Sequence, residues 1–166
     1  LPGHLQNANS QMFRIRAALA ATMSSCWGMY SGYELCENDP YPGKEEYDNS
    51  EKYELKQRDY NQLGNITAFI RALNLIRRDN PALHLYDNLS FHGADHGQML
   101  CVISHDAHHP AIGMVHLDLA ALGIDGSRPF KVTDLLHNQT YEWRGADNYV
   151  ALHPTGMSMH IFRVEQ

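Results

Sequence analysis

The pattern of apolar residues changes at Pro81, and this change limits the chain to a small set of folds. Before Pro81, apolar side chains recur every three or four residues, which is typical of helices with one buried face. After Pro81, short apolar runs alternate with turn residues, which is typical of antiparallel strands. We therefore predict helical, βα-type material in residues 1–83 and a separate antiparallel β-sandwich in residues 88–166.

The first predicted helix spans Ser10–Met23, and its cap is predicted to be Ser10 because a serine hydroxyl can accept a bond from a free amide of the first turn. One face of this helix is expected to be apolar, because four apolar residues recur there at helical spacing: Met12, Ile15, Ala18 and Leu19.

The second predicted helix begins after Asn65, its expected cap, and ends at Asn80-Pro81. Arg77 and Arg78 fall in its last turn, where cations suit the negative end of the helix. Its apolar stripe is the clearest in the chain and predicts a core-facing side, which consists of Ile66, Phe69, Ile70, Leu73 and Ile76.

Between these helices, the apolar run Cys26–Tyr30 favours a buried strand of a parallel sheet, followed by a turn at Ser31-Gly32. Residues 34–64 show little periodicity and several turn signals. Structureless loops of this length in compact domains are usually functional or disordered. A parallel strand needs neighbouring strands, so we expect the rest of this sheet to lie in chain upstream of Leu1.

The second half of the chain contains seven short apolar runs separated by turns, among them Asp125-Gly126-Ser127 and Arg144-Gly145. The strands of the sandwich are expected at Leu89–Phe91, Met99–Ser104, Met114–Leu119, Phe130–Asp134, Gln139–Trp143, Tyr149–Leu152 and Met159–Val164. Trp143, Tyr141 and Tyr149 favour packing inside this sandwich over a surface platform for sugars.

Composition excludes several classes of function. Charged residues make up 19% of the chain and the net charge is −6 without a basic run, which argues against nucleic-acid binding. No apolar stretch is long enough for a membrane span. The three cysteines include no CxxC pair, which predicts buried free thiols in a reducing cytoplasm.

Eleven histidines raise the possibility of a metal site, especially at His105, His108 and His109. No neighbouring residues complete a ligand set at the spacing of structural zinc sites, so turn histidines are the favoured interpretation. We expect no metal ligands, and we find no signature of any other cofactor.

Three segments resemble the bacterial α-1,4-glucan:maltose-1-phosphate maltosyltransferases, a family of the α-amylase superfamily. Trp27–Asn38 is similar to the eighth-strand segment of that family, Asp48–Glu54 to the loop that follows, and Leu73–Leu83 to the end of the eighth helix. The resemblance covers the whole chain and is densest over residues 27–83. It implies that residues 1–83 are the end of a (β/α)8 barrel, with helix 7, strand 8, loop 8 and helix 8, before a C-terminal β-sandwich.

The resemblance also implies a function. Such enzymes are retaining transferases of the cytoplasm that move maltosyl from α-maltose 1-phosphate to α-1,4-glucans in glycogen synthesis, and they are expected to be homodimers. Their catalytic nucleophile, acid/base and stabilising aspartate match no residue of this chain, so we expect this piece alone to be inactive and to need the N-terminal part of the same protein. The start at Leu1, without an initiator methionine, is also expected for a piece of a longer protein.

Lys52 and Tyr53 match the pair that contacts maltose 1-phosphate in the family, so they are the principal substrate-binding candidates. A lysine ammonium can oppose phosphate charge, and a tyrosine offers a ring face and a hydroxyl to a sugar. Tyr30, Tyr33 and Glu34 are further candidates for the floor of the site, with structural packing as the alternative.

Two other functions stay open on the residues alone. One is a different α-amylase-type enzyme, either a glucan hydrolase or a trehalose-forming relative, and the other is a non-catalytic glucan-binding module. Without the rest of a barrel, the stripe around Ile66, Ile70 and Leu73 is expected to be exposed and to drive association.

Overall fold

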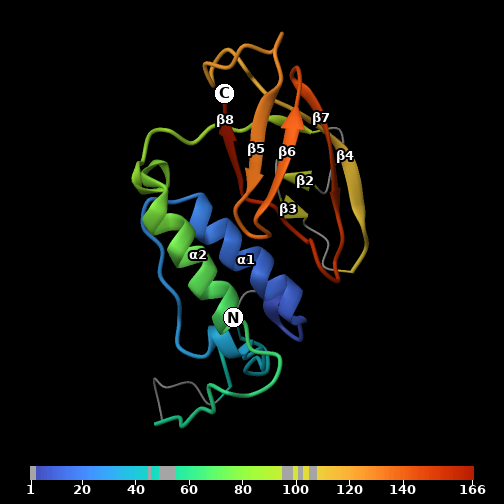
Figure 1. The fold of residues 1–166 in the computed structure, drawn as a ribbon. Helices are drawn as coiled ribbons and strands as arrows, with labels where there is room; N and C mark the ends of the chain where they lie inside the picture. The colour runs from blue at the N-terminus through green and yellow to red at the C-terminus, as the bar shows by residue number, and fades with distance from the viewer. Residues whose placement is uncertain (1–2, 45, 49–54, 95–98, 101–102, 105–107) are drawn as a thin grey trace. The chain divides into compact units, whose positions relative to one another are not determined.

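The computed structural model describes residues 3–44, 46–48, 55–94, 99–100, 103–104 and 108–166, and Figure 1 traces the chain from the N- to the C-terminus. The chain divides into two compact units, Leu1–Leu85 and Tyr86–Gln166. The first unit is helical and the second is built of strands, as the change of pattern at Pro81 predicts. Neither α-helix of the described part is long and apolar enough to cross a membrane.

Two α-helices of the first unit lie side by side, α1 (Ser10–Thr22) and α2 (Thr67–Asp79) (Figure 1). Both predicted helices are thereby confirmed, to within two residues at each end. The described part of this unit also contains three short 3₁₀ turns: η1 (Gly3–Leu5), η2 (Tyr33–Leu35) and η3 (Pro81–His84).

The start of α1 differs from the prediction. The cap is Asn9, whose side-chain oxygen accepts a hydrogen bond of 3.1 Å from the backbone amide of Met12. Asparagine and serine are equally good caps, so the sequence alone had no means of choosing between these neighbours. The buried face is also rotated from the predicted one, because Met12 and Leu19 are only half-buried. The buried residues are Phe13, Ile15, Ala17, Ala18 and Ala21.

The apolar stripe of α2 faces the core as predicted, since Ile66, Ile70, Leu73 and Ile76 are all buried. Phe69 is half-buried beneath the guanidinium of Arg14, which lies 5.5 Å from the ring centroid. The expectation that this stripe is exposed without a surrounding barrel is therefore wrong. The neighbouring α1 packs against α2 and has three small alanines among its buried residues, Ala17, Ala18 and Ala21. The stripe is therefore covered within this chain.

Arg77 has a role that its position in the last turn of α2 did not reveal. Its side chain is buried and donates hydrogen bonds to the carbonyl oxygens of Ala21, Ser24 and Ser25, the last two at 2.9 and 2.7 Å. The last carbonyls of a helix have no partner within the helix. Arg77 therefore supplies hydrogen-bond donors at the C-terminal end of α1 rather than at the end of its own helix.

The strand predicted at Cys26–Tyr30 is wrong, because these residues have irregular backbone and pair with no strand in the described part of the chain. Apolar content alone does not make a strand, since each backbone amide and carbonyl of a strand needs a partner on a neighbour. The turn at Ser31-Gly32 is present. The described residues therefore show no unit of a (β/α)8 barrel.

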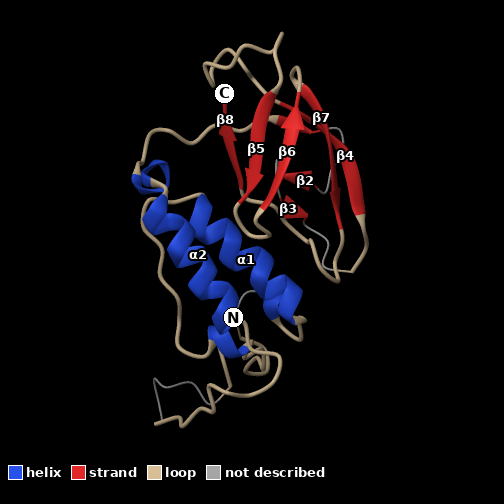
Figure 2. Ribbon diagram, in the orientation of Figure 1, coloured by secondary structure: helices blue, strands red, loops and turns tan. Residues whose placement is uncertain are grey.

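The second unit consists of antiparallel sheets (Figure 2). One three-stranded sheet has the order β1-β4-β7, a second has the order β6-β5-β8, and β2 and β3 form a two-stranded ribbon. The strands are β1 (Gly93–Ala94), β2 (Met99–Leu100), β3 (Ile103–Ser104), β4 (Ala111–His116), β5 (Phe130–Asp134), β6 (Gln139–Trp143), β7 (Asp147–Leu152) and β8 (Phe162–Glu165).

The predicted antiparallel β domain is therefore confirmed. The bounds of β5 and β6 agree with the sequence pattern, and β7 starts two residues earlier. The run predicted at Met114–Leu119 belongs to a strand that starts at Ala111, and no strand forms at Leu89–Phe91. Short apolar runs identify strands well but mark their ends poorly, because the end of a strand depends on where its partner ends.

The two larger sheets share one apolar core. Val115 of β4 and Val150 and Leu152 of β7 are buried, and Trp143 of β6 and Phe162 of β8 pack against them. This contact confirms the predicted core role of Trp143. Tyr149 points away from the core and is 61% exposed, because residues on a strand alternate between its two faces.

A candidate substrate loop and its surroundings

A long loop between η2 and α2 is the candidate functional site. Between Cys36 and Ile66, the described residues form no helix and no strand, only an isolated bridge between Pro40 and Tyr47. The loop is closed at its base, where the amide of Ile66 donates to the carbonyl of Glu34 at 2.7 Å. The side-chain amide of Gln62 donates to the carbonyl of Leu35 at 3.0 Å. The start and the end of the loop are thereby held together.

A second set of interactions joins the two arms of the loop further along the chain, at Glu37. Its carboxylate accepts hydrogen bonds from both Nε and Nη2 of Arg58, at 2.8 and 3.2 Å, and from Nζ of Lys56 at 3.1 Å. The Arg58 side chain is only 4% exposed. Bidentate pairs between arginine and carboxylate are strong and fix geometry. We call Glu37, Lys56 and Arg58 the loop clamp, since they join the two arms of the loop.

Gly32 makes room for the loop clamp. Its φ of +90° lies in the left-handed region, and a Cβ atom here would lie 2.3 Å from Oε2 of Glu37. The same atom would lie 2.9 Å from Nε of Arg58. Glycine is therefore required at this position for two independent reasons, the backbone angle and the space for the ion pair.

The loop clamp determines the ionisation of Glu37. Burial alone would raise the pKa of this carboxyl, but the hydrogen bonds and charges of Arg58 and Lys56 outweigh burial and hold the pKa below 4.5. Glu37 is therefore ionised at neutral pH, and the clamp is a true ion pair.

We expect acid to weaken the first unit through this residue. A carboxyl whose pKa is lower in the folded state stabilises the fold above its unfolded pKa, and the contribution is lost as pH falls through the folded value. In Glu37→Gln, the stability should be lower than in the parent chain at neutral pH. The difference should shrink as the pH falls below 4.5, the ordinary value for this carboxyl. Urea midpoints of both proteins across this pH range measure it, and a difference that stays constant would contradict the prediction.

The predicted floor residues are placed as follows. Tyr30 is 45% exposed and stacks on Tyr47, with ring centroids 5.3 Å apart. The Tyr33 hydroxyl donates to the carbonyl of Phe13 at 2.6 Å, so this side chain anchors η2 to α1. Burial raises the pKa of Tyr33, which keeps the hydroxyl a donor. Glu34 is half-buried, and its Oε2 has no hydrogen-bond partner among the described residues.

Lys52 and Tyr53 lie outside the described residues, so the structure does not test their predicted role.

Of the thiols, Cys36 is half-buried, and burial raises its pKa to about 11. Cys26 is exposed, which contradicts the prediction that it is buried. It lies in the segment predicted as a buried strand, so both errors have the same cause.

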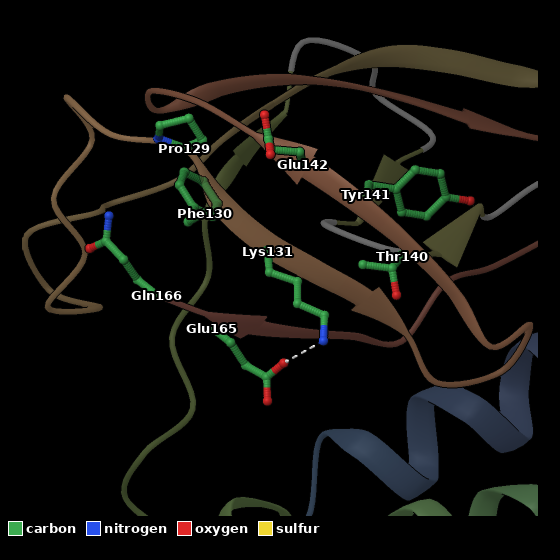
Figure 3. A pocket seen from close by; sticks show the side chains of 8 residues that line it. All are labelled: Pro129, Phe130, Lys131, Thr140, Tyr141, Glu142, Glu165 and Gln166. Carbon is green, nitrogen blue, oxygen red and sulfur yellow. Dashed lines mark ion pairs between the residues drawn. The ribbon is translucent and has the colours of Figure 1, made fainter.

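The second unit has a cavity of about 620 Å³ over the sheet β6-β5-β8 (Figure 3). Lys131 and Glu165 form an ion pair of 3.6 Å along one side, and Glu142 and Tyr141 contribute from β6. The cavity is shallow and is lined by side chains of both charges, which suits solvent-exposed polar contacts rather than a buried reaction centre.

The fold places the chain among proteins that join a helical unit to an antiparallel β unit. A family model described as "GLGE, C-terminal" matches residues 75–164, and the chain belongs to this family. The match covers the second unit and the end of α2.

Curated relatives extend the similarity to the whole chain. A protein of Methylacidiphilum infernorum is 40% identical over 181 aligned positions, which cover 100% of this chain and 27% of the relative. One of Rhodospirillum rubrum is 39% identical and covers 99% of the chain and 26% of the relative. One of Myxococcus xanthus is 42% identical and covers 93% of the chain and 25% of the relative. Each is named alpha-1,4-glucan:maltose-1-phosphate maltosyltransferase. The chain thus spans about a quarter of the length of these relatives.

Proposed function

We propose that this chain is part of a retaining maltosyltransferase that moves maltosyl from α-maltose 1-phosphate to α-1,4-glucans and releases phosphate. The observation that carries the proposal is the identity of about 40% across the whole chain to relatives with this name. The similarity includes the first unit with its loop as well as the β domain, so it supports more than a shared C-terminal domain.

The proposal assigns a place in the enzyme to each unit. Residues 1–83 would be the last βα units of a (β/α)8 barrel, and residues 88–166 the C-terminal sandwich. Loops after barrel strands build the active site in this architecture, which gives a physical reason for the length of the loop between η2 and α2. The irregular backbone at Cys26–Tyr30 is consistent with this, because a barrel strand needs neighbours from other parts of the barrel.

In the proposed mechanism, the loop binds the donor substrate rather than performing the chemistry. Retention by double displacement requires two carboxyls about 5–5.5 Å apart. The matching carboxylates of the family belong to other segments of the barrel. Lys52 would oppose the phosphate charge of maltose 1-phosphate, and Tyr53 would contact the sugar. The loop clamp supports this role, because it fixes the arm that leads from Glu37 to these residues and the arm at Lys56 that returns.

The test is a kinetic comparison in the intact enzyme. Lys52→Met and Tyr53→Phe should each raise the KM for maltose 1-phosphate, Lys52→Met by about 10- to 100-fold, since a charged hydrogen bond contributes about 1.5–3 kcal/mol. Lys44→Met is the matched control, because Lys44 belongs to the same loop, is exposed and lies over the ring of Tyr41. Phosphate release measures all three, and an unchanged KM in Lys52→Met would refute the assignment.

Two further assays separate the alternatives. The 166-residue chain alone should release no phosphate from maltose 1-phosphate, and turnover by this chain would overthrow the assignment of the catalytic groups to other segments. Sedimentation with glycogen tests the alternative of a glucan-binding module, which predicts binding without any role for Lys52. The homodimer and the cytoplasmic location belong to the same proposal and rest on the resemblance alone.

A further inference from the structure

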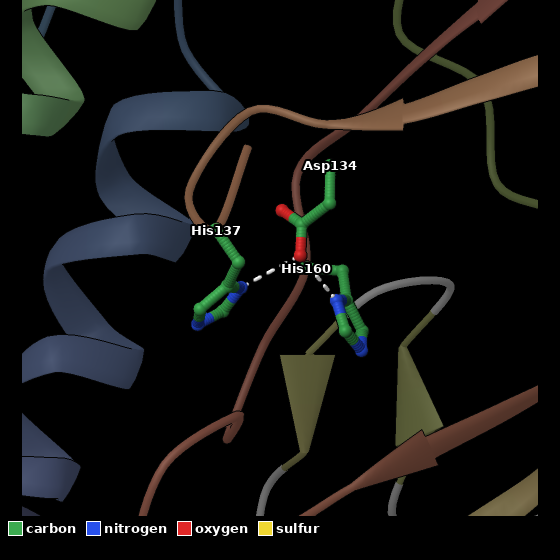
Figure 4. Close-up of side chains that lie close together, drawn as sticks. All are labelled: Asp134, His137 and His160. Atoms are coloured by element: carbon green, nitrogen blue, oxygen red, sulfur yellow. Dashed lines mark hydrogen bonds and ion pairs between the residues drawn. The ribbon is translucent and has the colours of Figure 1, made fainter. Parts of the chain in front are cut away.

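Three side chains with metal-binding atoms meet at the end of β5, in a part of the β unit that the proposed function does not use. They are Asp134, the last residue of β5, His137 in the turn to β6, and His160 just before β8 (Figure 4). Their ligand atoms all lie within 4.8 Å of one another. Among the described residues, this is the only group of three or more such side chains that converge in this way.

Both imidazoles point at one oxygen atom. Nδ1 of His137 lies 2.6 Å from Oδ2 of Asp134, and Nδ1 of His160 lies 2.7 Å from the same oxygen (Figure 4). Asp134 is completely buried and the His160 side chain is 4% exposed, while the His137 side chain is 27% exposed. Asp134 and His160 are therefore shielded from solvent, whereas His137 is partly accessible to it.

Backbone groups contact the second oxygen of Asp134 and the second ring nitrogen of His160. The other carboxylate oxygen of Asp134 accepts from the amide of Leu136 at 3.0 Å. Nε2 of His160 lies 3.3 Å from the carbonyl oxygen of Ala151. Metal-bound histidines almost always donate their second ring nitrogen to a carbonyl or carboxylate in this manner. The groups that orient the ligands of a metal site are thus already in place.

The surroundings of His160 offer a hydrogen-bond acceptor to each ring nitrogen. Both ring nitrogens face oxygens that only accept, the carboxylate of Asp134 and the carbonyl of Ala151. With Nε2–H donating to Ala151, only a proton or a metal ion at Nδ1 can satisfy the contact with Asp134. A divalent cation in that position would neutralise the buried carboxylate and serve both imidazoles at once.

We propose that the β unit binds one Zn²⁺ through Oδ2 of Asp134, Nδ1 of His137 and Nδ1 of His160. Two imidazoles and a carboxylate are ligands that zinc commonly takes, with water in the fourth position. The exposed side of His137 leaves room for this water and a path for the ion. Neighbouring ligands of a tetrahedral zinc ion lie about 3.3 Å apart, so each ring has to retreat from Oδ2 by about 0.6 Å. The partly exposed turn at His137 permits such a movement of the His137 ring.

The zinc would act as a structural cross-link between two segments of the β unit. Asp134 and His137 belong to β5 and its turn, and His160 belongs to the segment that connects β7 to β8. A bound ion would add a side-chain link between these two segments beside the backbone hydrogen bond of 2.8 Å from the amide of Leu135 to the carbonyl of Ile161. Sequence spacing concealed the cluster, because 26 residues separate Asp134 from His160.

The experiment is zinc titration of the purified 166-residue chain after removal of metal with a chelator. Calorimetry should show one zinc ion per chain, and Co²⁺ in place of zinc should give the visible absorption of a tetrahedral site. The thermal unfolding midpoint should rise with zinc concentration, because an ion that binds only the folded state stabilises it. His137→Ala should weaken zinc binding by at least about tenfold.

His116→Ala is the matched control. His116 lies 2.6 Å from Asp147 in the same β unit, so it reproduces one histidine–aspartate contact without a third ligand. This variant should bind zinc as the parent does. His137 lies in a partly exposed turn, so its replacement should leave the fold intact, which far-UV circular dichroism checks. His137→Cys restores a zinc ligand at this position and should recover part of the affinity. This variant separates the loss of the ligand from any loss of stability in His137→Ala.

Three results would overturn the proposal. The first is no saturable zinc binding to the parent chain. The second is equal affinity in His137→Ala and the parent, which would assign the zinc to surface histidines such as His108 and His109. The third is an equal loss of affinity in His116→Ala, which would show that the Asp134 cluster has no special role. The proposal is independent of the proposed transferase activity, since none of these measurements depends on turnover.

Discussion

Replacement of Arg77 by alanine is expected to destabilise the first unit by about 3 kcal/mol. Arg77 is buried and donates to three carbonyl groups, that of Ala21 in the last turn of α1 and those of Ser24 and Ser25 just after the helix. Alanine would leave these carbonyls without a donor and would also remove the positive charge from the negative end of α1. Urea unfolding measures the loss, and the fluorescence of Trp27 reports on the first unit.

Arg78→Ala is the control for this substitution. Arg78 is the next residue of α2, but its side chain is 69% exposed and its ion pair is with its neighbour Asp79. Exposed ion pairs contribute little to stability. The urea midpoint of Arg78→Ala should therefore match that of the parent chain. Equal losses in the two variants would mean that the position in the helix, and not the contacts with α1, determines the role of Arg77.

Leu73→Ala is expected to cost about 2–5 kcal/mol, because large-to-small changes in a core lose burial and leave a cavity. Leu73 is 1% exposed and lies at the centre of the apolar stripe of α2. The stripe is covered within the chain, so the cost should appear in the isolated 166-residue protein. A loss below about 1 kcal/mol would show that this face is loosely packed, as the sequence-based expectation of an exposed stripe requires.

Leu75→Ala provides the matched comparison, since Leu75 is the same residue type on the same helix but is 39% exposed. Its loss should be a small fraction of that of Leu73→Ala. Both variants are best measured in a Trp143→Phe background, because Trp27 and Trp143 are the two tryptophans of the chain and each lies in a different unit. The fluorescence signal then arises from the first unit alone.

The helices and most strands could be predicted because their signals are local. The stripe of α2 repeats at helical spacing, and the runs at Phe130–Asp134 and Gln139–Trp143 are bounded by turn residues on both sides. The run at Cys26–Tyr30 carries the same apolar signal but forms no strand. A strand depends on partners elsewhere in the chain, and local composition carries no information about them.

The candidate site was predictable only in part. Resemblance to a family drew attention to Lys52 and Tyr53, whose role stays a prediction. The loop clamp was missed, although Glu37 lies in the most characteristic segment of the first unit. Its partners are 19 and 21 residues away, and no periodic pattern connects residues at such separations across a loop.

By itself, the sequence determined the change from helices to strands along the chain, the two helices, the antiparallel character of the second unit and membership of a family. These features follow from residue type and short-range spacing, which act before the chain has folded. Only the tertiary structure decided that Arg77 serves the end of another helix, that Glu37 joins two arms of a loop, and that Asp134, His137 and His160 converge. Each of these arrangements joins a charged side chain to a partner far along the chain, which is 26 residues away for Asp134 and His160. Such contacts come from packing that no local pattern contains.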